Sequence, residues 1–230
     1  MSFSSLQLTL RTLLPGMALG LLPGRGLLTV PIDHLSQASL FLLLAYSLVF
    51  LLVSSLSVSS TPSLYSLTKR TIQASVHTLA VSLVLHTLAL LFGAPLLDQS
   101  WETYMGALFI AIFSVYPVSL DHPISLKDWS LCCKSFSSSS STLPLDSPLL
   151  SPSWLFPLGS ALFGAWLGAM TIPLDWDRPW QRWPIPCVVG AAISHTLSLP
   201  LYHRLPPSLR PSLLMPSPPT PMPSRHDHDD

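Results

Sequence analysis

Long apolar runs alternate with short polar segments along most of the chain. A helix needs about 20 mostly apolar residues to cross a bilayer, and five runs approach that length: 38–58, 74–92, 103–120, 154–172 and 184–202. A sixth run, 12–31, is weaker because it holds Pro15, Pro23, Arg25 and four glycines. Proline and glycine are tolerated in membrane helices, so we interpret this run as a broken or tilted span, with an amphipathic N-terminal segment as the alternative. The pattern predicts an all-α, polytopic membrane bundle of about six transmembrane helices over residues 1–204.

Two segments lack the apolar runs. Residues 135–153 are rich in serine and proline, which is typical of a flexible linker. Residues 205–230 are rich in proline and cannot build a core, so we expect a disordered tail.

Composition supports a membrane protein. Only 10% of the residues are charged, whereas a soluble globular protein carries about a quarter, and the mean hydropathy is +0.50. The net charge is zero, so no basic surface argues for nucleic acid as a partner. The three cysteines suit neither a disulfide framework nor a Cys-x-x-Cys metal site.

Basic residues predict the orientation, because lysine and arginine concentrate on the cytoplasmic side of membrane proteins. With six spans, one side carries only Arg178 and Arg182 outside the spans. The other side carries eight basic residues: Arg11, Lys69, Arg70, Lys127, Lys134, Arg204, Arg210 and Arg225. This difference predicts cytoplasmic termini and places residues 173–186 in the last lumenal or extracellular loop. With five spans the tail would change sides.

The segment PLDWDRPWQRWPIP, residues 173–186, concentrates charge between two apolar runs. Asp175 and Asp177 would point to opposite sides of an extended backbone, so they form a poor catalytic or metal-binding pair unless a turn brings them together. The other interpretations are internal pairing with Arg178 and Arg182, docking of a partner, and contact with a lipid phosphate, which the planar guanidinium suits. We favour the structural and docking interpretations.

The same segment contains Trp176, Trp180 and Trp183. Tryptophan is enriched at membrane–water interfaces, which predicts a lumenal hairpin lying on the membrane surface. Aromatic hot spots for a partner protein remain the alternative.

Small residues flank the segment. Ser160, Gly164 and Gly168 recur every four residues in one run, and Gly190 lies in the next. This spacing lets helix backbones approach closely. We expect the two runs to pack as an antiparallel hairpin, with docking of another subunit's helix as the alternative.

The remaining reactive side chains show no arrangement typical of a catalytic or metal site. His77 and His86 are nine positions apart, which places them about 180° apart on a helix, and His195 stands alone. We expect these histidines to form interhelical hydrogen bonds. Cys132 and Cys133 are weak candidates for palmitoylation. Because no serine elbow, phosphate-binding loop or acid cluster is found, we predict no catalytic residue, metal or cofactor.

Two blocks of this sequence resemble the PIG-F family of glycosylphosphatidylinositol (GPI) anchor synthesis. The first is GAWLGAMTIPLDWDRPWQRWPIPCVVGA, residues 164–191, which is long and rich in rare residues; the second is LFGAPLLDQSWETYMGALFIAIFSVYP, residues 91–117. The matching positions are Gly164, Trp166, Gly168, Pro173, Leu174, Asp175, Trp176, Arg178, Pro179, Trp180, Gln181, Trp183 and Pro184, with Gly93, Ala94, Pro95 and Glu102.

The resemblance implies a fungal-type endoplasmic-reticulum membrane protein that is not itself an enzyme. Members of the family stabilise the GPI ethanolamine-phosphate transferases PIG-O and PIG-G, which move ethanolamine phosphate from phosphatidylethanolamine to mannoses of the GPI precursor. The resemblance assigns no catalytic role to any matched residue. Direct presentation of the lipid, or participation in the transfer, remains the alternative function.

Overall fold

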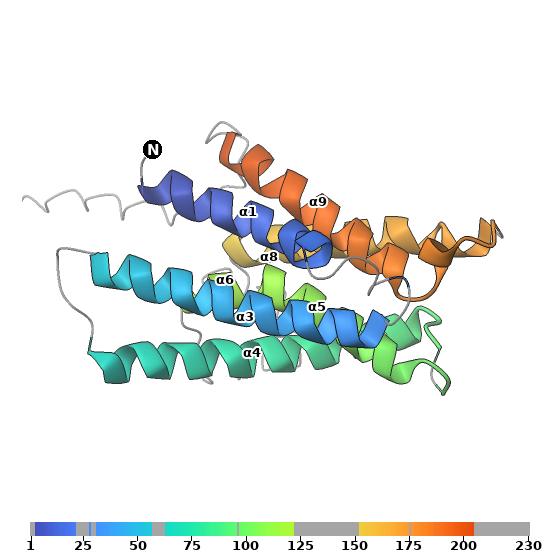
Figure 1. The fold of residues 1–230 in the computed structure, drawn as a ribbon, viewed down its shortest axis with the longest axis horizontal. Coiled ribbons are helices and arrows are strands. Elements are labelled where there is room, and N and C mark those ends of the chain that lie inside the picture. Colours follow the sequence, from blue (N-terminus) through green and yellow to red (C-terminus); the bar gives the residue numbers. More distant parts are fainter. Residues whose placement is uncertain are drawn as a thin grey trace, which may run out of the picture.

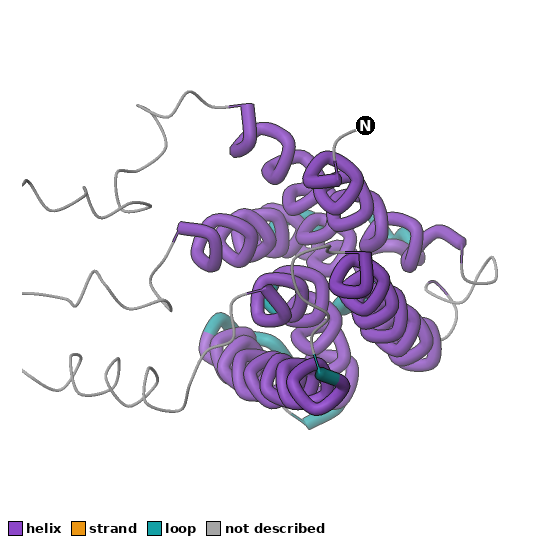
Figure 2. Tube along the Cα trace, turned by 90° about the vertical axis from the view of Figure 1, so that its left-hand side faces the viewer, coloured by secondary structure: helices purple, strands orange, loops and turns teal. Residues whose placement is uncertain are grey.

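A computed structural model describes residues 3–21, 28, 31–56, 63–95, 97–121, 152–174 and 176–204. Within these ranges the chain is helical and forms no strand (Figures 1 and 2). The α-helices are α1 (Phe3–Leu21), α3 (Pro31–Leu56), α4 (Leu64–Leu91), α5 (Ser100–Ser114), α6 (Tyr116–Asp121), α8 (Pro152–Ala169) and α9 (Ile185–Arg204). Two short 3-10 helices, η2 (Ile172–Leu174) and η3 (Pro179–Gln181), lie between α8 and α9.

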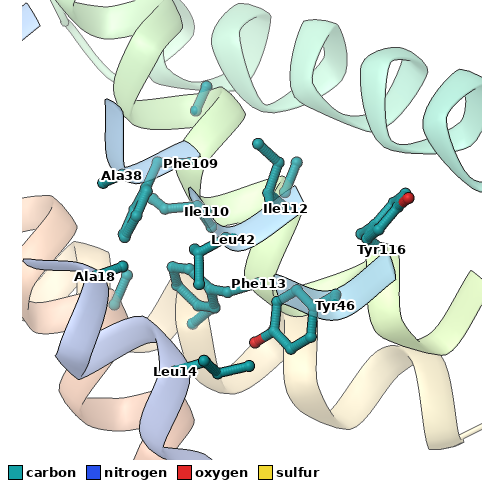
Figure 3. Close-up of a cluster of buried hydrophobic side chains, with 14 of the residues drawn as sticks. Leu14, Ala18, Ala38, Leu42, Tyr46, Phe109, Ile110, Ile112, Phe113 and Tyr116 are labelled. Atoms are coloured by element: carbon teal, nitrogen blue, oxygen red, sulfur yellow. The ribbon is translucent and has the colours of Figure 1, made fainter. Parts of the chain in front are cut away.

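Helix α5 forms the centre of the bundle and contacts α1, α3, α4, α8 and α9. From Met105 to Phe113 it is apolar on every side, as expected of a helix enclosed by others. Phe109 and Phe113 are fully buried there, and Leu42 of α3 and Leu14 of α1 belong to the same cluster (Figure 3). This central position matters for the site, because the start of α5 contacts the segment between α8 and α9.

The run predicted as one span over 103–120 is divided into α5 and α6 at Val115. Pro117 has no backbone N–H and cannot donate to the carbonyl of Phe113, and its ring crowds that carbonyl. The break therefore follows from local chemistry that a hydropathy pattern does not register.

Four described helices are long and apolar enough to cross a membrane: Asp33–Leu52, Leu64–Leu91, Leu155–Leu174 and Ile185–Tyr202. The described residues thus confirm a mostly helical chain with four helices that could cross a membrane, while the count of six spans stays a prediction. Helix α1 covers only part of the run 12–31, and most of residues 22–30 lies outside the described part. The linker up to residue 151, Cys132, Cys133 and the tail 205–230 lie outside it as well.

Helix α4 begins ten residues before the predicted start at residue 74. Its first turns carry Thr68, Lys69, Arg70 and Gln73. These polar residues lower the hydropathy without breaking the helix, because lysine, arginine and glutamine are good helix formers. Hydropathy therefore located the apolar part of the helix but not the residue at which the helix begins.

Polar side chains tie α1 to its neighbours where Pro15 interrupts its hydrogen bonds. The carbonyl of Arg11 loses its partner because the residue four positions later is proline, and the Tyr46 hydroxyl of α3 donates to it at 3.5 Å. From α9, the Thr196 hydroxyl donates to the Thr12 carbonyl at 3.0 Å. The Tyr46 hydroxyl thus satisfies the carbonyl that the proline frees, as a membrane interior requires, and Thr196 adds a bond between α9 and α1 at the next carbonyl.

Candidate functional site

The closest helix pair in the bundle is α8 with α9. A Cβ atom on Gly164 would overlap the carbonyl oxygen of Gly190, and one on Gly190 would overlap the carbonyl oxygen of Gly164. A Cβ on Gly168 would meet the backbone of Pro186 in the same way. The two backbones therefore touch directly at these glycines, which only residues without a side chain allow.

Ser160 lies on the same face, where the Ser198 hydroxyl of α9 donates to the Ser160 hydroxyl at 2.8 Å. The structure thus brings Ser160, Gly164, Gly168 and Gly190 together at one contact. Because α9 of the same chain covers this face of α8, the small-residue face is not available to another subunit's helix.

The segment that joins α8 to α9, residues 170–184 and here called the hairpin, is held by the side chain of Gln181. This side chain is buried, accepts the Arg178 N–H at 3.1 Å and donates to the Thr171 carbonyl at 2.8 Å. It thereby links η3 to the end of α8. Asp177 has a positive φ of 48°, a conformation in which aspartate is tolerated better than most residues. Asp175 lies outside the described residues.

Trp183 ties the hairpin to the centre of the bundle. Its indole N–H donates to the Thr103 hydroxyl of α5 at 2.8 Å. The next residue, Pro184, lies against Gly106 of α5, where an added Cβ would come within 3.4 Å of the proline ring. The sequence pattern grouped Trp183 with the interfacial tryptophans, whereas the structure uses it as an internal contact.

Trp176 and Trp180 point outward. They are 54% and 39% exposed, and their rings meet edge to face with centroids 5.8 Å apart. Both lie beyond the ends of the apolar spans of α8 and α9. This placement suits an aromatic anchor or a contact for a partner.

Arg178 and Arg182 are exposed as well. The described residues form one ion pair, between Arg11 and Asp121. Asp177 therefore does not pair with either arginine, contrary to what the internal-pairing interpretation expected. The hairpin therefore presents two guanidinium groups that the described part of the chain does not neutralise.

The other block of matching residues forms the end of α4. Gly93 has a φ of 94°, its N–H bonds to the Leu90 carbonyl, and the Ala94 N–H bonds to the Ala89 carbonyl at 3.0 Å. This pair of backbone hydrogen bonds is a Schellman motif, which needs a residue with positive φ and therefore favours glycine. Pro95 follows because it cannot continue the helix. Glu102 lies in the first turn of α5, where a negative charge interacts favourably with the helix dipole.

The three histidines considered in the sequence, His77, His86 and His195, lie within the described bundle and form no common site. His195 of α9 is buried, its Nδ1 lies 3.4 Å from the Pro157 carbonyl of α8, and its ring stacks edge to face on Phe113. His86 packs against the ring of Tyr104, and His77 is buried on α4. In the part of the chain that the structure describes, no three His, Cys, Asp or Glu side chains gather in a way that could hold a metal ion.

Sequence reasoning gave no role to Gln181 or Thr103. Gln181 stood in the family-matching block, and a lone glutamine among exposed residues carries no signal of burial. Thr103 could be found only through its partner, which lies 80 positions away in the chain.

We predict that Trp183→Phe weakens the attachment of the hairpin without unfolding the bundle. The phenyl ring keeps most of the apolar contact but loses the hydrogen bond, which contributes about 1 kcal/mol. The melting temperature in detergent should fall by a few degrees. Thr103→Val should lower it at least as much, because the threonine hydroxyl also donates to the Gln99 carbonyl at 2.8 Å. A double variant that is no less stable than Thr103→Val alone would show that the Trp183 change acts through this bond; additive losses would contradict it.

Comparisons with known proteins agree with the earlier resemblance. The chain is 36% identical over 114 residues to the human GPI ethanolamine phosphate transferase, stabilizing subunit, covering 50% of this chain and 48% of that protein. It is 34% identical over 152 residues to the mouse protein of that name, covering 66% of each. It is 36% identical over 132 residues to the PIGF/3-ketodihydrosphingosine reductase fusion protein of Schizosaccharomyces pombe, covering 56% of this chain and 24% of that protein.

The alignments therefore span between a quarter and two thirds of these relatives' own lengths. No solved structure gives a significant match. The model of the GPI biosynthesis protein family Pig-F matches residues 12–201, which include α8, the hairpin and all of α9 except its last three residues. The resemblance read from the two sequence blocks is thereby confirmed, and the chain belongs to the Pig-F family of GPI biosynthesis proteins.

Proposed function

We propose that this chain is a non-catalytic membrane subunit that stabilises GPI ethanolamine-phosphate transferases, of the PIG-O and PIG-G kind, in the endoplasmic reticulum. The family match and the names of the human and mouse relatives support it. The observation that carries it is the hairpin. Gln181 and Trp183 hold its backbone, while Trp176, Trp180 and Arg178 are exposed. Exposed tryptophan and arginine on a held backbone are the residues that most often dominate protein–protein binding.

In the proposed orientation both termini are cytoplasmic and the hairpin is lumenal. Lys69 and Arg70 lie near the start of α4, and Arg204 ends α9, at the end of the bundle opposite the hairpin (Figure 1). This separation of charges follows the usual preference of basic residues for the cytoplasmic side. Headgroups of phosphatidylethanolamine and of the GPI precursor would meet the chain at the hairpin end.

Removal of the chain tests the proposal. Cells that lack it should lose most of the transferase protein and accumulate GPI precursors without the dependent ethanolamine phosphate. Immunoblotting of the transferase and mass spectrometry of the precursors measure the two effects. A transferase with normal abundance and normal activity in the absence of this chain would contradict the proposal.

Arg178→Ala separates this function from the alternative in which the chain itself presents lipid or takes part in the transfer, which the relatives' names do not favour. If the hairpin docks a partner, the variant should reduce co-purification of the transferase, and transfer should fall only in proportion. Arg70→Ala, an exposed arginine at the other end, is the control. An intact complex without transfer would support the alternative instead.

A further inference from the structure

The outer face of α8 carries a stripe of exposed residues opposite the glycines that touch α9. We call it the α8 stripe, and it consists of Leu155, Gly159, Leu162, Phe163, Trp166 and Met170. Successive members are separated by one, three or four positions, which places them along one side of a helix. The opposite side, with Gly164, is already covered by α9.

Helix α8 is the least covered of the four apolar spans. The rest of the chain buries 17% of its span, against 28% to 44% for the other three. Its main partner is α9. Apart from α9, helix α8 contacts mainly α5, so its outer face is not covered by the described part of the chain.

The α8 stripe differs in composition from an ordinary lipid-facing surface of the same protein. Between residues 72 and 88 of α4, the exposed large apolar side chains are all aliphatic: Ile72, Val76, Leu79, Leu83, Val84 and Leu88. The α8 stripe instead combines Met170 with the rings of Phe163 and Trp166, whose centroids are 6.1 Å apart. Aromatic residues and methionine are enriched in protein interfaces.

Gly159 adds a second difference. It is exposed, and an added Cβ would meet nothing within 4 Å. This glycine therefore serves no packing inside the chain. Without a side chain at Gly159, the backbone of another helix could approach α8 closely at this point, which is how membrane helices associate.

Charge marks one end of the stripe. Met170 leads directly into the hairpin, where Arg178 and Arg182 are exposed and have no ion-pair partner in the described part of the chain. A helix that lies along the stripe would leave the membrane beside these two guanidinium groups. A carboxylate at that point would be stabilised by them.

From these observations we infer that the α8 stripe binds a transmembrane helix of the transferase. That helix is apolar along the stripe and carries an acidic residue where it leaves the membrane beside Arg178 and Arg182. The inference rests on the proposed function and adds to it the membrane-embedded half of the docking surface.

Gly159→Leu tests this inference in the full chain expressed in cells that lack their own copy. The leucine fits within this chain because the position is open, but it fills the site that a partner backbone would occupy. Co-purification of the transferase should fall about tenfold, as for a hot-spot change. The matched control is Gly16→Leu on α1, another exposed helical glycine with nothing within 4 Å of an added Cβ. Equal loss with both variants, or no loss with Gly159→Leu, would overturn the inference.

A photoreactive amino acid identifies the occupant directly. Placed at Phe163 it should form a covalent adduct with the transferase, whereas at Leu83 of α4, which is equally exposed at 57%, it should react with lipid. Lipid adducts alone at Phe163, or an adduct of two copies of this chain, would overturn the inference. Either outcome leaves the proposed function standing if loss of the chain still depletes the transferase.

Discussion

Gly164→Ala should destabilise the bundle by about 3 kcal/mol, the upper end of what overpacking costs, and should deplete the chain from the membrane. The new methyl group would overlap the Gly190 carbonyl oxygen and lie about as close to the Cβ of Ser194, 2.5 Å from it. Backbone atoms cannot rotate away as a side chain can, so α8 and α9 must separate. Because close packing is what holds membrane helices together, the separation costs most of their contact. Thermal unfolding of the detergent-solubilised chain and its abundance in microsomes measure the effect.

Gly159→Ala provides the control on the same helix. Its methyl group meets nothing within 4 Å, and alanine favours a helix over glycine by about 1 kcal/mol, so this variant should be as stable as the original or slightly more stable. The same chemical change would then have opposite signs at positions five residues apart. Equal melting temperatures for Gly164→Ala and the unaltered chain would show that the α8–α9 contact is looser than described.

Gln181→Leu should release the hairpin while leaving the helices packed. The leucine cannot replace the bonds to the Arg178 N–H and the Thr171 carbonyl, and losing a buried hydrogen-bonding group costs about 1–3 kcal/mol. The cost falls on the hairpin, since the glycine contacts between α8 and α9 do not involve this side chain. We expect faster proteolysis within residues 171–184 and about a tenfold loss of co-purified transferase, because a binding surface that is no longer held must be ordered on association.

Gln181→Glu separates the two bonds. A carboxylate still accepts the Arg178 N–H but cannot donate to the Thr171 carbonyl, so its effect should be intermediate. Full retention of transferase binding by Gln181→Leu, together with increased proteolysis, would show that the hairpin's fixed shape is not what the partner recognises.

The face of α8 that we propose for docking is not the face that the sequence pattern indicated. The small residues Ser160, Gly164 and Gly168 attract attention in the sequence because glycines at this spacing join membrane helices. They do so here, within the chain. In the proposed complex the partner therefore uses the remaining face, where Gly159 and Trp166 lie exposed.

Much of the fold could be predicted because hydropathy is a local property that adds up along the chain. The apolar runs located the helices that are long and apolar enough to cross a membrane, and the i, i+4 spacing of small residues located the face where two of them meet. The start of α4 and the break at Val115 could not be predicted in this way. Polar residues near Lys69 continue the helix without being apolar, and Pro117 breaks a helix without being polar.

The sequence by itself determined a helical membrane protein of the Pig-F family whose most distinctive segment joins two helices with small residues. Only the tertiary structure decided what each side chain of that segment does. Trp176 and Trp180 face outward whereas Trp183 bonds to Thr103, and Gln181 is buried. The sequence does not distinguish the three tryptophans, because it shows only the residue type and its immediate neighbours. Their roles differ because burial depends on which distant helix lies next to each one, and that is set by the packing of α5 against the α8–α9 pair.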